Sequence, residues 1–252
     1  MTEIIMIGCN GKMGQVISNL VKEDDSVTIV AGVDIFDDGR NTYPVFKNIE
    51  ECNVSADVAI DFSNPKGLDL ILKVGIERNL PLVLCTTGYS ESEIAQIKKA
   101  SEKVAILRSA NMSLGINTLL KVLQDVAKVL APANYDIEIV EKHHNQKIDA
   151  PSGTALALAD SINEALDQQY VYKYDRASVR EKRDKKEIGI MAVRGGNIVG
   201  EHEVIFAGTD EVIEIKHTAY SKAIFAKGSI SAAKFLKGKA AGMYDMSNVI
   251  KG

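Results

Sequence analysis

The sequence predicts an α/β protein in two parts, a mostly parallel sheet covered by helices and then an α+β part with an open, mixed sheet. Two observations support this fold class. Over the first 110 residues, short apolar runs alternate with stretches of helical periodicity, which is typical of parallel strands joined by crossover helices. After residue 111, several strand-like segments follow with few helices between them, which favours hairpins and an open sheet.

The first part begins with a buried strand at Ile4–Ile7, and a helix follows it. The apolar residues between Met13 and Val21 recur at intervals of three and four, so they share one helix face. The remaining elements expected here are strands at Val27–Asp34, Ala56–Asp61, Leu82–Cys85 and Val104–Leu107 and helices at Lys66–Asn79 and Glu91–Ser101.

A long amphipathic helix at Ser113–Leu130 opens the second part. Its further expected elements are strands at Tyr135–Glu141, Ile188–Val193, Glu203–Phe206 and Val212–Lys216 and helices at Ser152–Leu166 and Ser221–Lys237. Between them, Asp175–Glu187 is dense in charge and nearly free of apolar residues. This composition predicts a solvated loop, with a place beside a functional site as the alternative.

Composition and charge disfavour several classes of protein. The 252 residues include 30 basic and 34 acidic side chains, a formal net charge of -4, which argues against a broad nucleic-acid-binding surface. No apolar run approaches the roughly 20 residues that span a bilayer. Three cysteines in no metal-ligand spacing, and a start without basic residues, favour a cytoplasmic location. We expect no nucleic-acid partner, no membrane and no metal.

A glycine-rich turn, GCNGKMG at residues 8–14, follows the first strand and opens a helix. Asp34 ends the second strand 20 residues after Gly14. Glycines in this position let the backbone approach a pyrophosphate, whose charge meets the N–H groups at the helix N-terminus. This context predicts a Rossmann-like dinucleotide-binding domain. The alternative is a turn that only packs strand against helix, with Asp34 as a capping acid.

The expected cofactor is NADH or NADPH, with NADH favoured. A carboxylate at Asp34 suits a free ribose 2′-hydroxyl, whereas Lys12 in the glycine turn could receive a phosphate. Two more loops, at residues 85–88 and 109–112, follow predicted parallel strands, where ligands bind in such sheets. Thr86 and Asn111 could hydrogen-bond the nicotinamide ribose or carboxamide, and Asn111 could also cap the long helix.

Two adjacent histidines, His143 and His144, follow a predicted strand in the segment EKHHNQKIDAPSGT at residues 141–154. Together with Lys147 they give local positive charge and groups that move protons near neutral pH. The segment is expected to be a loop that enters a helix at Ser152, whose N-terminal N–H groups suit an anion. These features predict a site for a small substrate that carries carboxylates. The alternative is a surface loop with an ordinary helix cap.

The segment EKHHNQKIDAPSGTA closely resembles a sequence typical of the dihydrodipicolinate reductase family. Further similar segments follow in the family's order: GCNGKMG at 8–14, DFSNP at 61–65, TTG at 86–88, SANMSLGIN at 109–117, RGGNIVGEH at 194–202 and GMYDM at 242–246. The resemblance implies NAD(P)H-dependent reduction of 4-hydroxy-tetrahydrodipicolinate to tetrahydrodipicolinate, on the diaminopimelate route to lysine.

The resemblance also implies roles for individual residues. His143 would donate and accept the proton, and Lys147 would be a second proton donor. His144, Gly153 and Thr154 would hold the carboxylates of the cyclic dicarboxylate substrate. The cofactor would be surrounded by Gly8, Cys9, Asn10, Gly11, Lys12, Met13, Asp34, Cys85, Thr86, Thr87, Ser109, Ala110, Asn111 and Met112.

The same resemblance implies a homotetramer. Residues 1–112, completed by the C-terminal segment 221–252, would form the dinucleotide-binding domain. Residues 113–220 would form the substrate-binding and oligomerisation domain, with a hinge near residues 111–113.

Two other functions are weighed against this one. The chain could be another Rossmann reductase that acts on a different imine or semialdehyde. It could instead be a regulator that binds NAD(H) without turnover, although no DNA-binding motif supports that reading. The other two histidines, His202 and His217, lie in strand-like segments and are expected to be structural.

Overall fold

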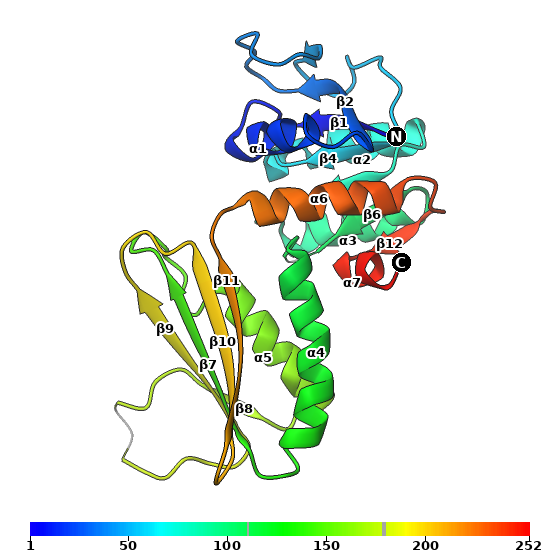
Figure 1. Ribbon diagram of the computed structural model, residues 1–252. Coiled ribbons are helices and arrows are strands. Elements are labelled where there is room, and N and C mark those ends of the chain that lie inside the picture. Colours follow the sequence, from blue (N-terminus) through cyan, green and yellow to red (C-terminus); the bar gives the residue numbers. More distant parts are fainter. Residues whose placement is uncertain (110, 178–179) are drawn as a thin grey trace. The chain divides into compact units, whose positions relative to one another are not determined.

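The computed structural model describes residues 1–109, 111–177 and 180–252 (Figure 1). The chain forms two compact units, each with its own sheet and its own core. One unit comprises Met1–Leu114 and Ala223–Gly252, and the other comprises Gly115–Lys222. Within the described ranges, no helix is long and apolar enough to cross a membrane. Ala110, which the resemblance places beside the cofactor, lies outside the described residues.

The first unit is built on a parallel sheet of seven strands in the order β12-β6-β5-β4-β1-β2-β3. The strands are β1 (Thr2–Ile7), β2 (Val27–Val33), β3 (Val45–Phe46), β4 (Val58–Asp61), β5 (Leu82–Leu84), β6 (Ala105–Arg108) and β12 (Gly242–Tyr244). The order from β3 to β6 is that of doubly wound dinucleotide-binding folds, and it reverses between β1 and β4. The predicted fold class is confirmed for this half.

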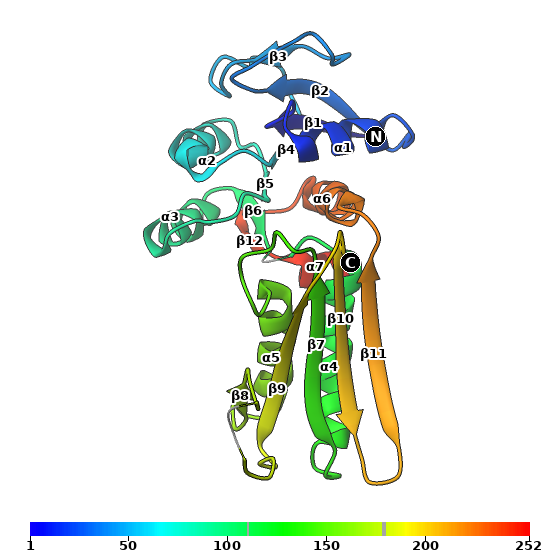
Figure 2. The ribbon, with the colours of Figure 1, turned by 90° about the vertical axis from the view of Figure 1, so that its left-hand side faces the viewer.

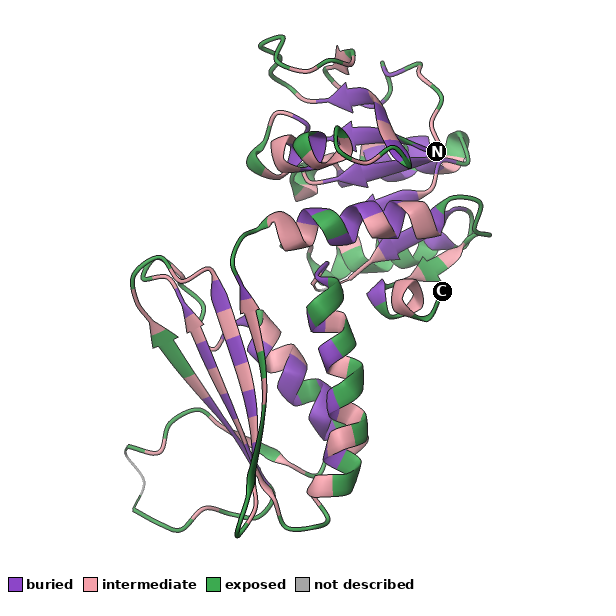
Figure 3. Ribbon diagram, viewed as in Figure 1, coloured by how far each residue is buried: buried purple, intermediate pink, exposed green. Residues whose placement is uncertain are grey.

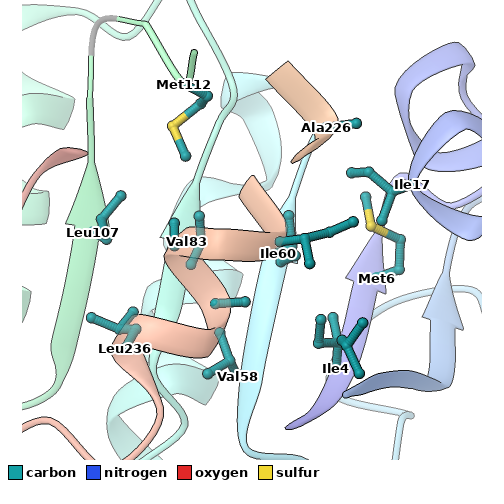
Figure 4. Packing of buried hydrophobic residues seen from close by; sticks show 14 of the residues in the cluster. Ile4, Met6, Ile17, Val58, Ile60, Val83, Leu107, Met112, Ala226 and Leu236 are labelled. Atoms are coloured by element: carbon teal, nitrogen blue, oxygen red, sulfur yellow. The ribbon is translucent and has the colours of Figure 1, made fainter. Parts of the chain in front are cut away.

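Helices cover both faces of this sheet (Figure 2). They are α1 (Lys12–Val21), α2 (Leu68–Glu77), α3 (Glu91–Ser101), α6 (Ala223–Leu236) and α7 (Met246–Lys251), with a 3-10 helix, η1 (Pro65–Gly67), before α2. Met6 and Ile60 of the strands pack with Ile17 of α1 and Ala226 of α6 in one core (Figure 4). Neighbouring strand residues enter a second core with α2 and α3, so the strands are apolar on both faces.

Three elements of this unit go beyond the sequence prediction, namely β3, β12 and α7. The two strands have only two and three residues, too few to show a periodicity. Gly242 of β12 pairs with Ala105 of β6, so the C-terminal segment contributes a strand to the edge of the N-terminal sheet. Side-chain pattern alone does not reveal such long-range pairing.

The second unit is built on a mixed sheet of five strands in the order β11-β10-β7-β9-β8. The elements are α4 (Leu114–Leu130), β7 (Asp136–His143), α5 (Gly153–Ala165), β8 (Val171–Lys173), β9 (Glu187–Arg194), β10 (Gly200–Ala207) and β11 (Val212–Ala219). β10 is antiparallel to both β7 and β11, whereas β9 is parallel to β7 and to β8. The predicted α+β half with an open, mixed sheet is confirmed, and β8 is an element that the sequence did not predict.

The helices α4 and α5 pack on one face of this sheet (Figure 2). On β7 the residues that face them are buried and those between are half-buried, an alternation that Figure 3 shows along β7 and β10. Ile137 and Ile139 therefore meet Leu123 of α4 and Leu158 of α5 in a single core. The same alternation directs Glu141, further along β7, to the covered face.

One expectation about the second unit needs correction. β7 continues to His143 instead of ending at residue 141, because its ladder with β9 extends to the pair His143–Arg194. His143 is thus held on a strand and not in a loop. Most described residues of the charged segment 175–187 are exposed, as expected of a solvated loop, while Arg183 Nη1 and Nε donate to Asp136 (2.9 Å) and Glu138 (2.8 Å) of β7. Residues 178 and 179 of this segment lie outside the described ranges.

Candidate active site

The turn between β1 and α1 leaves no room for a side chain at Gly8 or Gly14. Gly8 has a φ of +79°, and a Cβ there would lie 2.7 Å from the carbonyl oxygen of Phe62. A Cβ on Gly14 would lie 2.3 Å from the carbonyl oxygen of Gly8. The Gly11 N–H closes the turn by donating to the same Gly8 oxygen at 3.1 Å. Glycine at these positions lets the N-terminus of α1 approach the strand ends.

A cleft of about 380 Å³ opens at the carboxyl ends of β1, β2 and β4. Its lining includes Gly8, Gly11 and Asp34, which the sequence predicted beside a dinucleotide, and Lys47, which it did not. The Asp34 carboxylate accepts the Asn10 N–H at 3.0 Å. The cleft has a bare glycine backbone, a helix N-terminus and a carboxylate, and these groups fit the pyrophosphate and adenosine ribose of a nicotinamide dinucleotide.

The remaining residues of the glycine turn, at positions 9, 10, 12 and 13, range from fully buried to exposed. Cys9 is fully buried, and burial raises the pKa of its thiol to about 12. Asn10 donates to the carbonyl oxygen of Phe36 at 2.5 Å. Lys12 is exposed in the first turn of α1, and Met13 packs against the core.

Thr86 hydrogen-bonds within the protein. Its hydroxyl donates to the buried carboxylate of Asp61 at 2.7 Å, and Ser63 N–H donates to the same carboxylate at 3.0 Å. Burial raises the pKa of Asp61 despite these hydrogen bonds. Burial likewise raises the pKa of the Cys85 thiol, while Thr87 is exposed. Asp61 ends β4, and residues 85–87 follow β5; of the residues in this group, only Ser63 lines the cleft described above.

The loop after β6 contains polar residues and one buried apolar residue. Asn111 Oδ1 accepts the Ser113 N–H at 2.8 Å, which closes a local turn ahead of α4, whose first residue is Leu114. Met112 is buried in the core with Ala226, and Ser109 is half-buried. Met112 therefore contributes to packing, whereas the family resemblance placed it beside the cofactor.

In the second unit, Glu141 is the centre of a buried polar network. Its side chain has no exposed surface, and its carboxylate accepts four hydrogen bonds. Arg194 donates one from each terminal nitrogen at 2.7 Å, the Ser152 N–H donates at 3.0 Å, and His143 Nδ1 lies 2.6 Å from Oε2. Burial alone would raise the pKa of Glu141, but the hydrogen bonds from Arg194 and His143 outweigh it and lower this pKa.

His202 joins this network from β10. Its ring centroid lies 5.1 Å from that of His143 in an edge-on arrangement, and its Nε2 lies 2.9 Å from the Ser152 hydroxyl oxygen. That oxygen also accepts the Ala155 N–H at 3.1 Å and so caps α5. Burial lowers the pKa of His202 to about 4, and the neighbouring His143 adds to the effect. His202, expected to be structural, thus lies beside the predicted proton-transfer residue.

Lys147 lies on the loop between β7 and α5. Its Nζ pairs with Asp149 Oδ1 at 2.7 Å, and Arg194 Nη2 donates to the carbonyl oxygen of Asp149 at 2.6 Å. The half-buried His144 precedes this loop, and its carbonyl oxygen accepts the Lys147 N–H at 3.1 Å. Gly153, which is exposed, begins α5. Thr154, the next residue, belongs to the same first turn of the helix.

Neither Glu141 nor Arg194 was expected to be a site residue from the sequence. A signal for Glu141 was present, because it continues the odd-numbered series of Ile137 and Ile139 on the covered face of one strand. A charged residue at a core position requires buried partners. Arg194 opens the family-like segment RGGNIVGEH, but its pairing with Glu141 depends on the register between β7 and β9, which the sequence does not specify.

Comparisons with known proteins agree with this arrangement. A family model described as dihydrodipicolinate reductase, N-terminus, matches residues 2–112, and one described as dihydrodipicolinate reductase, C-terminus, matches residues 115–250. The chain is 51% identical over 251 residues to a 4-hydroxy-tetrahydrodipicolinate reductase of Clostridium novyi, covering 100% of this chain and 99% of the relative. It is 50% identical over 246 residues to the Clostridium tetani protein of the same name, covering 98% and 96%.

Solved structures show the same fold. A dipicolinate-bound dihydrodipicolinate reductase from Paenisporosarcina sp. TG-14 has a TM-score of 0.82 at 24% identity and covers 99% of each chain. A probable dehydrogenase from Thermotoga maritima has a TM-score of 0.62 at 11% identity, covering 98% of this chain and 92% of its own. The resemblance found in the sequence is confirmed: the chain belongs to the dihydrodipicolinate reductase family and is a nicotinamide-dependent reductase.

Proposed function

We propose that this chain reduces 4-hydroxy-tetrahydrodipicolinate, a cyclic dicarboxylate, to tetrahydrodipicolinate with NADH or NADPH, on the diaminopimelate route to lysine. The observation that carries the proposal is the contact of His143 Nδ1 with the buried carboxylate of Glu141, in a chain that also has a dinucleotide cleft. The names of the relatives that are about half identical over the whole chain support the substrate. So does the dipicolinate, itself a cyclic dicarboxylate, bound to the structural relative.

His143 is assigned to proton transfer. An ionised carboxylate can only accept hydrogen bonds, so the contact with Glu141 places a proton on Nδ1 of His143. Its Nε2 is then the nitrogen that exchanges a proton with the substrate. When bound, the dinucleotide would supply the hydride for the ring; the proton would go to the adjacent carbon, and the 4-hydroxyl group would leave as water.

Lys147 is assigned to charge neutralisation and to a second proton. Its present partner, Asp149, has a side chain that is 58% exposed, so the pair contributes only about 0–1 kcal/mol and a substrate carboxylate can replace it. Gly153 and Thr154 begin α5, where the helix dipole and the N–H groups of the first turn favour a carboxylate. His144 adds a further donor at the start of the loop.

NADH is proposed as the preferred cofactor. The carboxylate of Asp34 lines the cleft and would repel a 2′-phosphate while accepting a hydrogen bond from a 2′-hydroxyl. Lys47 lines the same cleft, and its positive charge favours some use of NADPH as well. The residues around the remainder of the cofactor are proposed to be those that the family resemblance implies.

A coupled assay tests the proposal. Dihydrodipicolinate synthase would generate the unstable substrate in the cuvette, and nicotinamide absorbance would report oxidation of NADH and of NADPH in parallel. We expect rapid oxidation of both, with a higher kcat/KM for NADH. If neither cofactor is oxidised while a known reductase works in the same mixture, the proposed reaction is wrong. A higher kcat/KM for NADPH would overturn only the preference.

The assembly is proposed to be a homotetramer in which residues 113–220 bind substrate and join subunits, while residues 1–112 and 221–252 bind the cofactor. The sheet face opposite α4 and α5 supports this, because Val193 and Val212 there are 44% and 56% exposed. Light scattering after size-exclusion chromatography should give four times the chain mass, and a monomer mass would contradict the proposal.

The three free cysteines support a reducing, cytoplasmic location.

A further inference from the structure

Along its covered face, the strand β7 changes from apolar residues to a charged one. Ile137 and Ile139 are fully buried in the core, and the next residue on this face, Glu141, is also fully buried but carries a carboxylate. Burying an ion pair costs solvation that its attraction repays only with good geometry, and an apolar pair of similar volume often stabilises a fold as well. Stability alone therefore does not explain a glutamate at this position.

The partners of Glu141 come from three elements that carry the proposed chemistry. His143 extends from β7 itself, and Ser152 is the N-cap of α5 and binds Glu141 through its backbone N–H. Arg194 ends β9 and binds both carboxylate oxygens, and it also holds the carbonyl oxygen of Asp149 on the loop that carries Lys147. One buried carboxylate thus connects the proton-transfer histidine, the loop and the helix N-terminus.

We propose that Glu141 is a positioning residue that fixes His143 as the tautomer protonated on Nδ1 and holds it in register with the N-terminus of α5. The inference rests on the proposed function, in which His143 exchanges a proton and α5 receives a substrate carboxylate. Glu141 does not contact the substrate in this assignment. Its carboxylate acts by accepting two hydrogen bonds, one from His143 Nδ1–H and one from the Ser152 N–H.

The tautomer follows from the chemistry of the partners. Two guanidinium nitrogens of Arg194 at 2.7 Å keep the Glu141 carboxylate ionised, and an ionised carboxylate has no proton to donate. His143 must therefore carry its proton on Nδ1, which leaves the Nε2 lone pair for the substrate in the neutral ring. The His202 ring beside it does not supply this orientation, because its Nε2 lies 2.9 Å from the hydroxyl oxygen of Ser152.

Glu141→Gln tests the inference, because it keeps the side-chain shape and removes the charge. A glutamine amide can either accept from Nδ1 or donate to it, so the His143 ring is no longer held in one tautomer. We expect kcat in the coupled assay to fall roughly 10- to 100-fold, as for other residues that orient a functional imidazole. KM for the cofactor should remain unchanged, since the cofactor cleft lies in the other unit.

Glu203→Gln is the matched control. Glu203 lies on β10 of the same sheet, next to His202 but on the opposite face, and it is half-buried. This variant should keep kcat within about twofold, as is usual for substitutions away from buried networks. A fall in kcat equal to that of Glu141→Gln would mean that loss of any carboxylate from the sheet has this effect, and would overturn the assignment.

Nitrogen-15 NMR of the histidine side chains gives a readout that does not depend on folding of a variant. In the wild-type protein, neutral His143 should be protonated on Nδ1, and in Glu141→Gln its two ring nitrogens should show a mixture of tautomers. Wild-type His143 protonated only on Nε2 would overturn the inference, whether or not the variant folds. A folded variant with unchanged kcat would overturn it as well. A wild-type protein without activity would instead contradict the proposed function.

Discussion

Replacing Gly14 with alanine tests how closely the glycine turn packs against α1. The added Cβ would lie 2.3 Å from the carbonyl oxygen of Gly8 and 2.6 Å from that of Cys9. Carbon–oxygen contacts are normally about 3.3 Å or longer, so the turn and the helix must separate by about 1 Å. Both obstacles are backbone atoms, so no side chain can rotate to make room.

Two opposing terms set the effect of Gly14→Ala on stability. Overpacking of this kind costs about 1–3 kcal/mol, and the better helix propensity of alanine returns about 1 kcal/mol. We therefore expect the free energy of unfolding to fall by up to about 2 kcal/mol. A turn displaced by about 1 Å also holds the pyrophosphate poorly, so KM for NADH should rise by roughly 10- to 100-fold.

Urea unfolding and cofactor titration measure these two effects. Gly11→Ala is the comparison for stability, because its Cβ would meet a single atom, the Gly8 oxygen, at 3.2 Å. It should lower the free energy of unfolding by less than about 1 kcal/mol. If Gly14→Ala has the stability and the KM of the wild-type protein, then the turn is not packed as described and the reasoning fails.

Three further predictions concern other parts of the chain. Asp34→Ala removes the carboxylate that disfavours a 2′-phosphate, so the ratio of kcat/KM for NADH to that for NADPH should fall; an unchanged ratio would exclude Asp34 as the selector. Burial lowers the pKa of His202 to about 4, so between pH 6.5 and 4 the unfolded chain binds more protons than the folded chain. The free energy of unfolding should therefore drop by about 3 kcal/mol as pH falls over that range. His202→Asn should reduce this pH dependence, and equal slopes of unfolding free energy against pH in the variant and the wild-type protein would refute the assignment. Leu158→Ala removes a fully buried side chain and should cost about 2–5 kcal/mol in urea unfolding, and a loss below 1 kcal/mol would place this residue outside the core.

Much of the fold could be predicted because the sequence patterns are local. The alternation of apolar runs with helical periodicity predicted the parallel sheet, and each helix expected from it is present within a few residues. The elements missed, β3, β8, β12 and α7, have two to six residues, too few to show a clear periodicity, and β12 also depends on a partner far along the chain. The pairing of Gly242 with Ala105 illustrates this, because neither residue has a local signal for it.

The residues proposed for the chemistry were predicted from the sequence, but the residues that hold them in place were not. His143 and Lys147 are polar residues in a segment with a family resemblance, so their positions in the sequence were sufficient to select them. The contacts of Glu141 with Arg194 depend on strand register, which the sequence does not specify. His202 was expected to be structural because a histidine in a strand usually is, and only the pairing of β10 with β7 places it beside His143.

The most direct test of the account is the turnover of Lys147→Ala in the coupled assay, measured against Lys121→Ala. Both variants remove one ammonium group from the second unit, but Lys121 is exposed on α4. The account predicts that Lys147→Ala lowers kcat by at least about 100-fold, because a proton donor and a carboxylate partner are both lost, while Lys121→Ala stays within about twofold. Unchanged turnover in folded Lys147→Ala would contradict the assignment of this site.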